Sequence, residues 1–237
     1  MKTAVKLALV DNSIDPEAYA PRVHWGEFLP VPFDAFRAKD GRLPRLGAGY
    51  THIILSGSEA SILERESWAE EEADFVREAQ ARRVPLLGSC WGHQLLAYAL
   101  GGPSCVGRCR APEIGWIEVR ILAASRILGP VGTAWVFSSH FDEVLGLGPS
   151  FRVLAASPLC AVQAFEMAGR PVWGLQIHPE ISIARGRETL LRFAERDPRG
   201  RGIFESALRA EPRDSGLIRG IVAGFLGAGP NMVPEGE

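Results

Sequence analysis

Apolar runs bounded by polar turns mark the strands in the first half of the chain. Residues 4–10, 50–55 and 84–87 are largely apolar, which is typical of strands that are buried on both faces of a sheet. Two other stretches, 67–83 and 91–100, carry apolar residues at helical spacing. Strands that alternate with helices in this way predict a parallel sheet with right-handed crossovers.

The pattern changes after residue 102, where short apolar runs are separated by turns rather than by helices. This part predicts an antiparallel β region with a hairpin tip at residues 168–170. Its expected strands cover residues 114–122, 133–137, 151–156, 161–167 and 171–177. Two later helices are expected at 183–195 and 215–226, with residues 197–202 as a loop between them.

Together these patterns predict an α/β fold, a three-layer sandwich around a mostly parallel central sheet with an additional antiparallel β region. We expect one domain over residues 1–226 and a loose tail over residues 227–237. One more strand is expected at 31–37, and Ser67 is expected to cap the helix that it opens. Residues 11–40 are rich in proline and aromatic side chains, and we expect them to shape the rim of a pocket.

The stretch around Cys90 combines the end of a strand, a tight turn and the start of a helix. Gly88 and Gly92 flank the cysteine on either side. A nucleophile elbow has this pattern, because its tight turn leaves little room for neighbouring side chains. The thiol would stand at a helix N-terminus, where the helix dipole and the free amides favour the thiolate.

A thiol nucleophile needs a base, and the base needs a group that orients it. His178 follows an expected strand end, where α/β sheets place their sites, and Glu180 comes two residues later. His93 lies one turn into the elbow helix and is expected to point away from the thiol. His52 falls inside a buried strand and is expected to be a core residue.

Composition limits the remaining function classes. The 237 residues are 46% apolar and 23% charged, and their net charge of −2 offers no basic surplus for nucleic acid. The first apolar run is too short for a signal peptide and no run is long enough to span a membrane, so we expect a cytoplasmic protein. Four cysteines without Cys-x-x-Cys spacing predict reduced thiols, and we expect no metal or other cofactor and no role for Cys105 and Cys109.

Two segments resemble the signatures of the class I glutamine amidotransferase family. They are Gly-Ser-Cys-Trp-Gly-His-Gln at residues 88–94 and Gly-Leu-Gln-Ile-His-Pro-Glu at residues 174–180. Residues 138–144 resemble the family's Ser-His-x-Asp-x-Val segment, a loop near the substrate, and residues 113–116 are also similar to the family. The resemblance covers about residues 31–226, and it implies the flavodoxin-like architecture of this family.

The resemblance implies a role for each matching residue. Cys90 would attack the side-chain amide of glutamine and form a γ-glutamyl thioester. His178 would act as general base and then protonate the departing ammonia, and Glu180 would orient His178.

The resemblance also implies the residues around the glutamyl group. The oxyanion would be held by the backbone amides of Ser58 and Trp91. The substrate-binding residues would be Gly57, Gln94, Ser139 and His140.

One loop departs from the family pattern. Family members that feed a synthetase usually have Gly-Gly-Pro in the oxyanion loop, whereas this chain has Gly57-Ser58-Glu59. The loop is more similar to that of stand-alone amidotransferase-like proteins, a group that includes γ-glutamyl peptidases. No Walker-type phosphate loop is present, so any ATP chemistry would belong to another chain.

Three functions therefore stay open. The first is hydrolysis of the γ-amide of glutamine or of another γ-glutamyl small molecule, which releases ammonia or an amine, with a separate synthetase chain as the candidate acceptor. The second is a γ-glutamyl peptidase. The third is a non-catalytic regulatory or binding protein on the same scaffold, which the complete set of Cys90, His178 and Glu180 disfavours.

Overall fold

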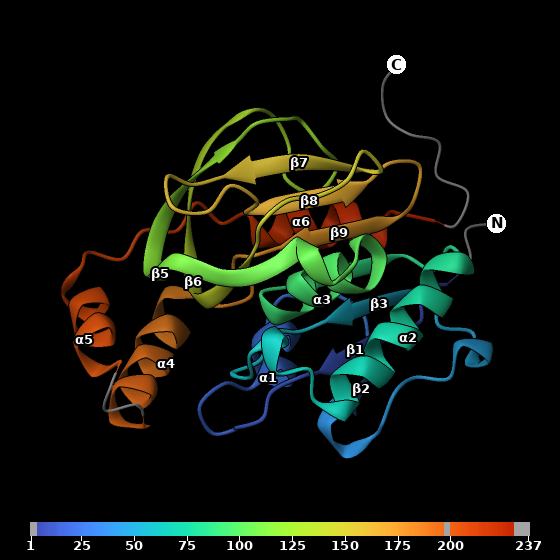
Figure 1. The fold of residues 1–237 in the computed structure, drawn as a ribbon, viewed down its shortest axis with the longest axis horizontal. Coiled ribbons are helices and arrows are strands. Elements are labelled where there is room, and N and C mark those ends of the chain that lie inside the picture. Colours follow the sequence, from blue (N-terminus) through green and yellow to red (C-terminus); the bar gives the residue numbers. More distant parts are fainter. Residues whose placement is uncertain (1–3, 197–199, 230–237) are drawn as a thin grey trace.

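The strands of the protein form a single curled sheet (Figure 1). The structure, a computed structural model, describes residues 4–196 and 200–229. Within these residues nine strands lie in the order β2-β1-β3-β4-β9-β8-β7-β5-β6. Their bounds are β1 Leu7–Asp11, β2 Phe33–Arg37, β3 His52–Leu55, β4 Leu86–Ser89, β5 Val106–Ile121, β6 Gly132–Val144, β7 Phe151–Ala156, β8 Ala164–Met167 and β9 Val172–Leu175.

The first five strands of this order are parallel and carry the site. Strand β4 lies between β3 and β9, with Gly88 paired to Leu55 on one side and to Gly174 on the other. The carboxyl ends of three neighbouring strands therefore meet at one edge of the sheet, where open α/β sheets bind their ligands.

Helices cover both faces of this parallel part and form the outer layers of the sandwich. Helices α2 (Ser67–Ala81) and α3 (Trp91–Gly101) pack on one face, where their apolar side chains meet β1, β3 and β4. Helices α1 (Pro21–Gly26) and α6 (Ile218–Leu226) bury Trp25, Ile221 and Phe225 against the other face. The predicted α/β class and the three layers around a parallel part of the sheet are confirmed, and the sheet as a whole is mixed.

The antiparallel region continues the same sheet through β8, β7, β5 and β6. Strands β5 and β6 form a long, curved pair, with a register shift between Arg108 and Glu113. Helices α4 (Ile183–Arg196) and α5 (Arg201–Arg209) pack against this pair at one end of the molecule (Figure 1) and enclose a small core that includes Trp116, Phe137 and Phe204.

Several boundaries differ from the sequence-based expectations. Strands β5 and β6 are longer than the apolar runs 114–122 and 133–137, because their outer parts alternate buried and exposed side chains. Residues 138–144, expected in a loop, lie in β6. Helix α2 does begin at Ser67, but its N-cap is Glu66 and no side chain caps it.

Two helices were missed. Helix α1 lies in the stretch that could not be assigned, and α5 begins at Arg201, inside the expected loop 197–202. Residues 197–199 of that loop and residues 230–237 of the expected tail lie outside the described residues, while Ala228 is buried. Among the described residues, no helix combines the length and the apolar character that crossing a membrane requires.

Candidate active site

The turn at Cys90 has the strained geometry of a nucleophile elbow. Cys90 has φ 48° and ψ −108°, a conformation that a residue with a side chain rarely adopts. A Cβ at Gly88 would lie 2.4 Å from the carbonyl oxygen of Gly92, and a Cβ at Gly92 would lie 2.3 Å from that of Leu55. Both glycines are therefore required by backbone contacts, and the elbow predicted from the sequence is present.

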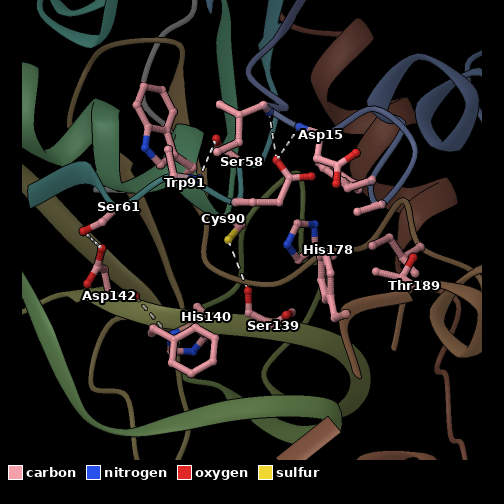
Figure 2. A pocket seen from close by; sticks show the side chains of 18 of the residues that line it. Asp15, Ser58, Ser61, Cys90, Trp91, Ser139, His140, Asp142, His178 and Thr189 are labelled. Carbon is pink, nitrogen blue, oxygen red and sulfur yellow. Dashed lines mark hydrogen bonds between the residues drawn. The ribbon is translucent and has the colours of Figure 1, made fainter. Parts of the chain in front are cut away.

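The three candidate catalytic residues meet at the edge where β3, β4 and β9 end. His178 follows β9, and its Nδ1 lies 2.7 Å from Oε1 of the fully buried Glu180. A Cβ at Gly57, after β3, would lie 2.6 Å from Cε1 of His178 and 3.4 Å from Cβ of Cys90. Figure 2 shows the imidazole of His178 beside the sulfur of Cys90. The base therefore lies between the thiol and the carboxylate that orients it.

The charges at Cys90, His178 and Glu180 influence the pKa values of these residues. Burial lowers the pKa of His178, but the negative charges of Cys90 and Glu180 outweigh burial and raise the pKa well above its usual value. Burial likewise raises the pKa of Glu180, and the His178 ring with the Tyr19 hydroxyl reverses that effect, so the net shift is downward. The site therefore favours an imidazolium at His178 and an ionised carboxylate at Glu180.

Tyr19 joins the triad from a segment to which the sequence analysis gave no catalytic role. Its hydroxyl donates a 2.7 Å hydrogen bond to Oε1 of Glu180, the same oxygen that His178 faces. Its ring packs edge-on against the His178 ring, with 5.3 Å between centroids. No motif marks Tyr19, because its partner lies 161 positions away along the chain.

The predicted oxyanion residues lie on the other side of the thiol. Trp91 is the first residue of α3, and Ser58 follows Gly57 in the loop after β3. Both residues line the cavity at Cys90, and Figure 2 shows them together on one side of the sulfur. The carbonyl of Ser56 accepts the amide of Gly92, which joins this loop to the start of α3.

The thiol opens into a cavity of about 400 Å³, a volume typical of pockets for small organic ligands. Figure 2 shows Ser61 and Asp142 on one side of Cys90, with Asp15 and Thr189 beyond His178 on the other. The first end also contains Arg108, which forms a 3.0 Å ion pair with Asp142.

Gln94 and Ser139 also line the cavity, as predicted for substrate-binding residues. The side-chain amide of Gln94 donates to the carbonyl of Asp142 at 2.7 Å, and the thiol of Cys90 donates to the carbonyl of Ser139 at 3.6 Å. Of the four residues expected to bind substrate, Gln94, Ser139 and His140 thus line the cavity, whereas Gly57 lies beside His178.

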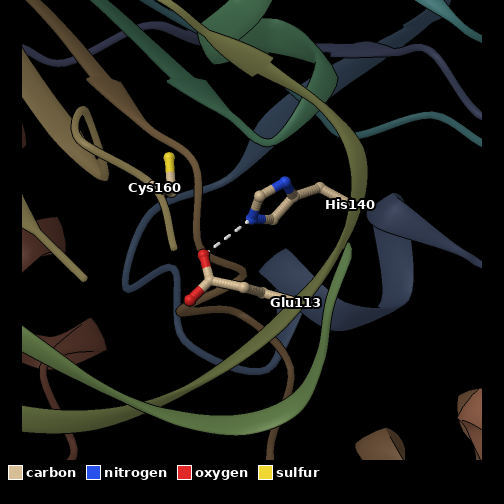
Figure 3. A group of neighbouring side chains, drawn as sticks. All are labelled: Glu113, His140 and Cys160. Atoms are coloured by element: carbon tan, nitrogen blue, oxygen red, sulfur yellow. Dashed lines mark hydrogen bonds and ion pairs between the residues drawn. The ribbon is translucent and has the colours of Figure 1, made fainter. Parts of the chain in front are cut away.

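The side chain of His140 points away from the thiol into a polar cluster with Glu113 and Cys160 (Figure 3). These three side chains offer ligand atoms within 4.8 Å of one another. However, Ser157 and Gln163 donate to Glu113 at 2.7 and 2.6 Å, and His140 lies 3.2 Å from it. The hydrogen bonds to both oxygens of Glu113 join β5, β6 and the segment at residues 157–163 into one buried polar network.

Two further histidines, His93 and His52, lie in the core, whereas the ring of His24 packs beside that of Tyr19, with 5.3 Å between centroids. His93 is fully buried beside Phe165, and burial lowers its pKa to about 3, so it stays neutral. His52 lies in the core with its Nε2 3.1 Å from the carbonyl of Ala228. Both histidines therefore lie where the sequence analysis expected them. All four cysteines are free thiols.

A comparison with known proteins identifies the family. Residues 28–195 match the family model "Glutamine amidotransferase class-I". The chain belongs to this family. The match includes Cys90, His178 and Glu180, and it confirms the resemblance stated from the two signature segments.

Proteins with similar sequences have names that fit this family. A glutamine-hydrolysing GMP synthase subunit from Pyrococcus abyssi is 41% identical over 110 residues, which cover 46% of this chain and 57% of that protein. The corresponding subunit from Methanothermobacter thermautotrophicus is 39% identical over 136 residues, or 56% of this chain and 71% of that protein. The chain thus matches 57% and 71% of the lengths of these two relatives.

Solved structures share the fold of the family. A glutamine amidotransferase from Thermotoga maritima aligns with a TM-score of 0.73 and 23% identity over 94% of this chain and 99% of that chain. One from Methylobacillus flagellatus aligns with a TM-score of 0.72 and 21% identity over 98% of both chains. These alignments confirm the predicted class I glutamine amidotransferase architecture.

Proposed function

We propose that the protein hydrolyses the γ-amide of glutamine through a γ-glutamyl thioester on Cys90. The observation that carries the proposal is the meeting of Cys90, His178 and Gly57 at the ends of three adjacent parallel strands. An imidazole held against a thiol by a buried carboxylate is an arrangement suited to nucleophilic acyl transfer.

The reaction proceeds in two balanced steps. In the first, the sulfur of Cys90 bonds to the γ-carbon, the amides of Ser58 and Trp91 stabilise the oxyanion, and the C–N bond breaks as His178 gives its proton to the departing nitrogen. In the second step a water gives its proton to His178, its oxygen bonds to the γ-carbon, and the C–S bond breaks. The products are ammonia and glutamate with a protonated γ-carboxyl group, which then gives its proton to ammonia in solution, and the thiolate and the imidazolium are restored.

The cavity end at Asp142 provides the charges that a free amino acid requires. Asp142 supplies a carboxylate for the α-ammonium group, and Arg108 supplies a guanidinium for the α-carboxylate. We place the glutamyl group at this end, with Gln94 and the backbone of Ser139 and His140 alongside it.

Replacing the nucleophile tests this proposal. We expect Cys90→Ser to lower the rate of glutamate release from glutamine by at least about 10³-fold, the scale on which such nucleophiles contribute. Cys109→Ser is the matched control, because Cys109 does not line the cavity, and it should keep the wild-type rate. Undiminished activity of Cys90→Ser would overturn the proposal.

A γ-glutamyl peptidase is the second candidate, and the cavity beyond His178 favours it. This end is lined by Ile181 and Phe193 and closed by the ion pair of Asp15 with Arg196. Ammonia needs no such chamber, whereas an amino-acid leaving group would place its side chain against the apolar wall and its carboxylate at Arg196.

A substrate pair separates the two candidates. If the peptidase is correct, Arg196→Ala lowers the rate of cleavage of γ-glutamyl dipeptides by about tenfold or more, the effect of losing a charged hydrogen bond, and spares glutamine hydrolysis. Arg192→Ala, on the same helix but outside the cavity lining, is the control. Equal effects of Arg196→Ala on both substrates would contradict a leaving-group site.

A separate synthetase chain is the candidate partner, since relatives of this chain are named as subunits of a glutamine-hydrolysing GMP synthase. Under this version, ammonia from glutamine passes to an acceptor bound to the partner. The isolated chain would then hydrolyse glutamine far below a typical enzyme turnover of about 10 s⁻¹ and would reach it only with the partner present. Full turnover by the isolated chain would show that no partner is needed.

A further inference from the structure

We propose that Tyr19 is a positioning residue for the Cys90 chemistry. Residues 12–19 hold it in place through hydrogen bonds to Ser56 and Glu59 of the oxyanion loop, a set of contacts that we call the clasp. The inference rests on the proposed function for its kinetic consequence. Tyr19 and the rest of residues 12–19 lie outside both family signature segments, whereas their partner Glu180 lies inside the second one.

The first step concerns the oxygen that Tyr19 and His178 share. Oε1 of Glu180 lies 2.7 Å from the Tyr19 hydroxyl and 2.7 Å from Nδ1 of His178. Two hydrogen bonds to one oxygen fix its direction, and the imidazole can then meet it in one orientation only. Tyr19 therefore sets the angle at which His178 faces the thiol.

The second step concerns the proton of Tyr19. Burial, followed by the negative charge of Glu180, raises the pKa of Tyr19 well above its usual value. The hydroxyl therefore keeps its proton over the pH range in which the protein is folded, and it remains a hydrogen-bond donor. A permanent donor stabilises the ionised carboxylate, which in turn stabilises the imidazolium of His178.

The third step is how the chain holds Tyr19. The hydroxyl of Ser13 lies 2.8 Å from the Tyr19 carbonyl and 3.2 Å from Oε1 of Glu59. Oε2 of Glu59 accepts the amide of Ile14 at 2.9 Å. Glu59 directly follows Ser58, so the residue after the predicted oxyanion donor also anchors the segment that carries Tyr19.

The base of the segment is fixed to the same loop. The amide of Asn12 donates to Oγ of Ser56 at 2.9 Å, and its side-chain amide donates to the Ser56 carbonyl at 3.1 Å. Residues 12–19 thus connect the oxyanion loop at one end with Glu180 at the other. This gives Glu59 a function at the position where synthetase-fed relatives usually have proline.

The test compares two tyrosines that make the same kind of bond. Tyr19→Phe removes the hydroxyl from Glu180, and Tyr50→Phe removes a 2.7 Å hydrogen bond to Asp34 at the surface. We expect Tyr19→Phe to lower kcat for glutamine by about tenfold or more while KM changes less than about twofold. Tyr50→Phe should match the wild type.

The pH dependence gives a second measurement that a purely structural role would not change. Without the Tyr19 donor the pKa of Glu180 rises, so the carboxylate protonates sooner on acidification and the imidazolium loses its partner. The acidic limb of both kcat/KM and the iodoacetamide alkylation rate of Cys90 should move to higher pH. Alkylation needs no turnover, so it tests the role of Tyr19 even if the wild type does not hydrolyse glutamine. A wild type without glutamine hydrolysis would contradict the proposed function and not the role of Tyr19.

A second variant acts through the clasp alone. Glu59→Gln should lower kcat in the same direction but less than Tyr19→Phe, because it loosens the segment and leaves the Tyr19 hydroxyl in place. An unchanged kcat and an unmoved acidic limb in Tyr19→Phe would overturn the inference. So would a rise in KM that accounts for the whole loss, because Tyr19 would then be a substrate-binding residue.

Discussion

Two segments flank the catalytic thiol and are held in different ways. The elbow at residues 88–92 is fixed by backbone contacts at distances that only glycine permits. The segment at residues 12–19 is fixed by polar side chains that come from distant parts of the chain. The comparison shows that the nucleophile depends on steric fit, whereas its base depends on hydrogen bonds that can be removed one at a time.

The largest effect is expected in the elbow. In Gly92→Ala the new Cβ would lie 2.3 Å from the carbonyl oxygen of Leu55, and neither backbone can give way. We expect the free energy of unfolding to fall by about 3 kcal/mol or more and activity to be lost. Chemical denaturation measures this, with Gly220→Ala as the control, because Gly220 is exposed and has open space around it. Wild-type stability of Gly92→Ala would show that the elbow is not held by contact with β3.

A smaller and more selective effect is expected at Gly57. A Cβ there would lie 2.6 Å from the His178 ring, which is a side chain and can move aside. Gly57→Ala should therefore fold with nearly wild-type stability but lose about 10²-fold in kcat, because a displaced base is costly to catalysis. Thermal unfolding and glutamine kinetics on the same sample separate the two quantities. Parallel losses of stability and activity would contradict the distinction.

The smallest effect on activity is expected behind the base of residues 12–19, where a buried carboxyl that does not line the cavity affects stability instead. Burial raises the pKa of Glu72 to about 8, and the neighbouring Asn12 side chain opposes this shift only in part. Because the folded state holds the proton more tightly than the unfolded state, this group contributes stability below about pH 4.5, and the contribution is lost as the pH rises toward 8.

Glu72→Gln should abolish this dependence. Its melting temperature should exceed that of the wild type at pH 8 and approach it at pH 5, as measured by thermal unfolding across that range. Glu71→Gln is the matched control, since Glu71 is the exposed neighbour on the same helix. The same slope in Glu72→Gln and in the wild type would show that the carboxyl is not held protonated.

The predictable parts of the molecule are those that local sequence determines. The strands β3 and β4 and the helices α2 and α3 follow from apolar runs and helical spacing, and the elbow follows from Gly88 and Gly92. The signature segments then identify the family. Each of these features needs information from only a few neighbouring residues.

The missed parts depend on tertiary contacts. Strand β6 extends through Ser139 and His140 because β5 pairs with it, not because its residues are apolar. Helix α5 buries Phe204 and Ala207 against β5 and the neighbouring α4. Tyr19 meets Glu180 only after the chain has folded, so no spacing along the sequence could have paired them.

The central claim is that Cys90 forms the γ-glutamyl thioester. The most direct measurement is acid-quench mass spectrometry of the enzyme during turnover of isotope-labelled glutamine, followed by peptide mapping of all four cysteines. The account predicts one labelled glutamyl group on Cys90 and none on Cys105, Cys109 or Cys160, because burial raises the pKa of each of those three thiols. A label on any of the other cysteines, or turnover with no label on Cys90, would contradict the account.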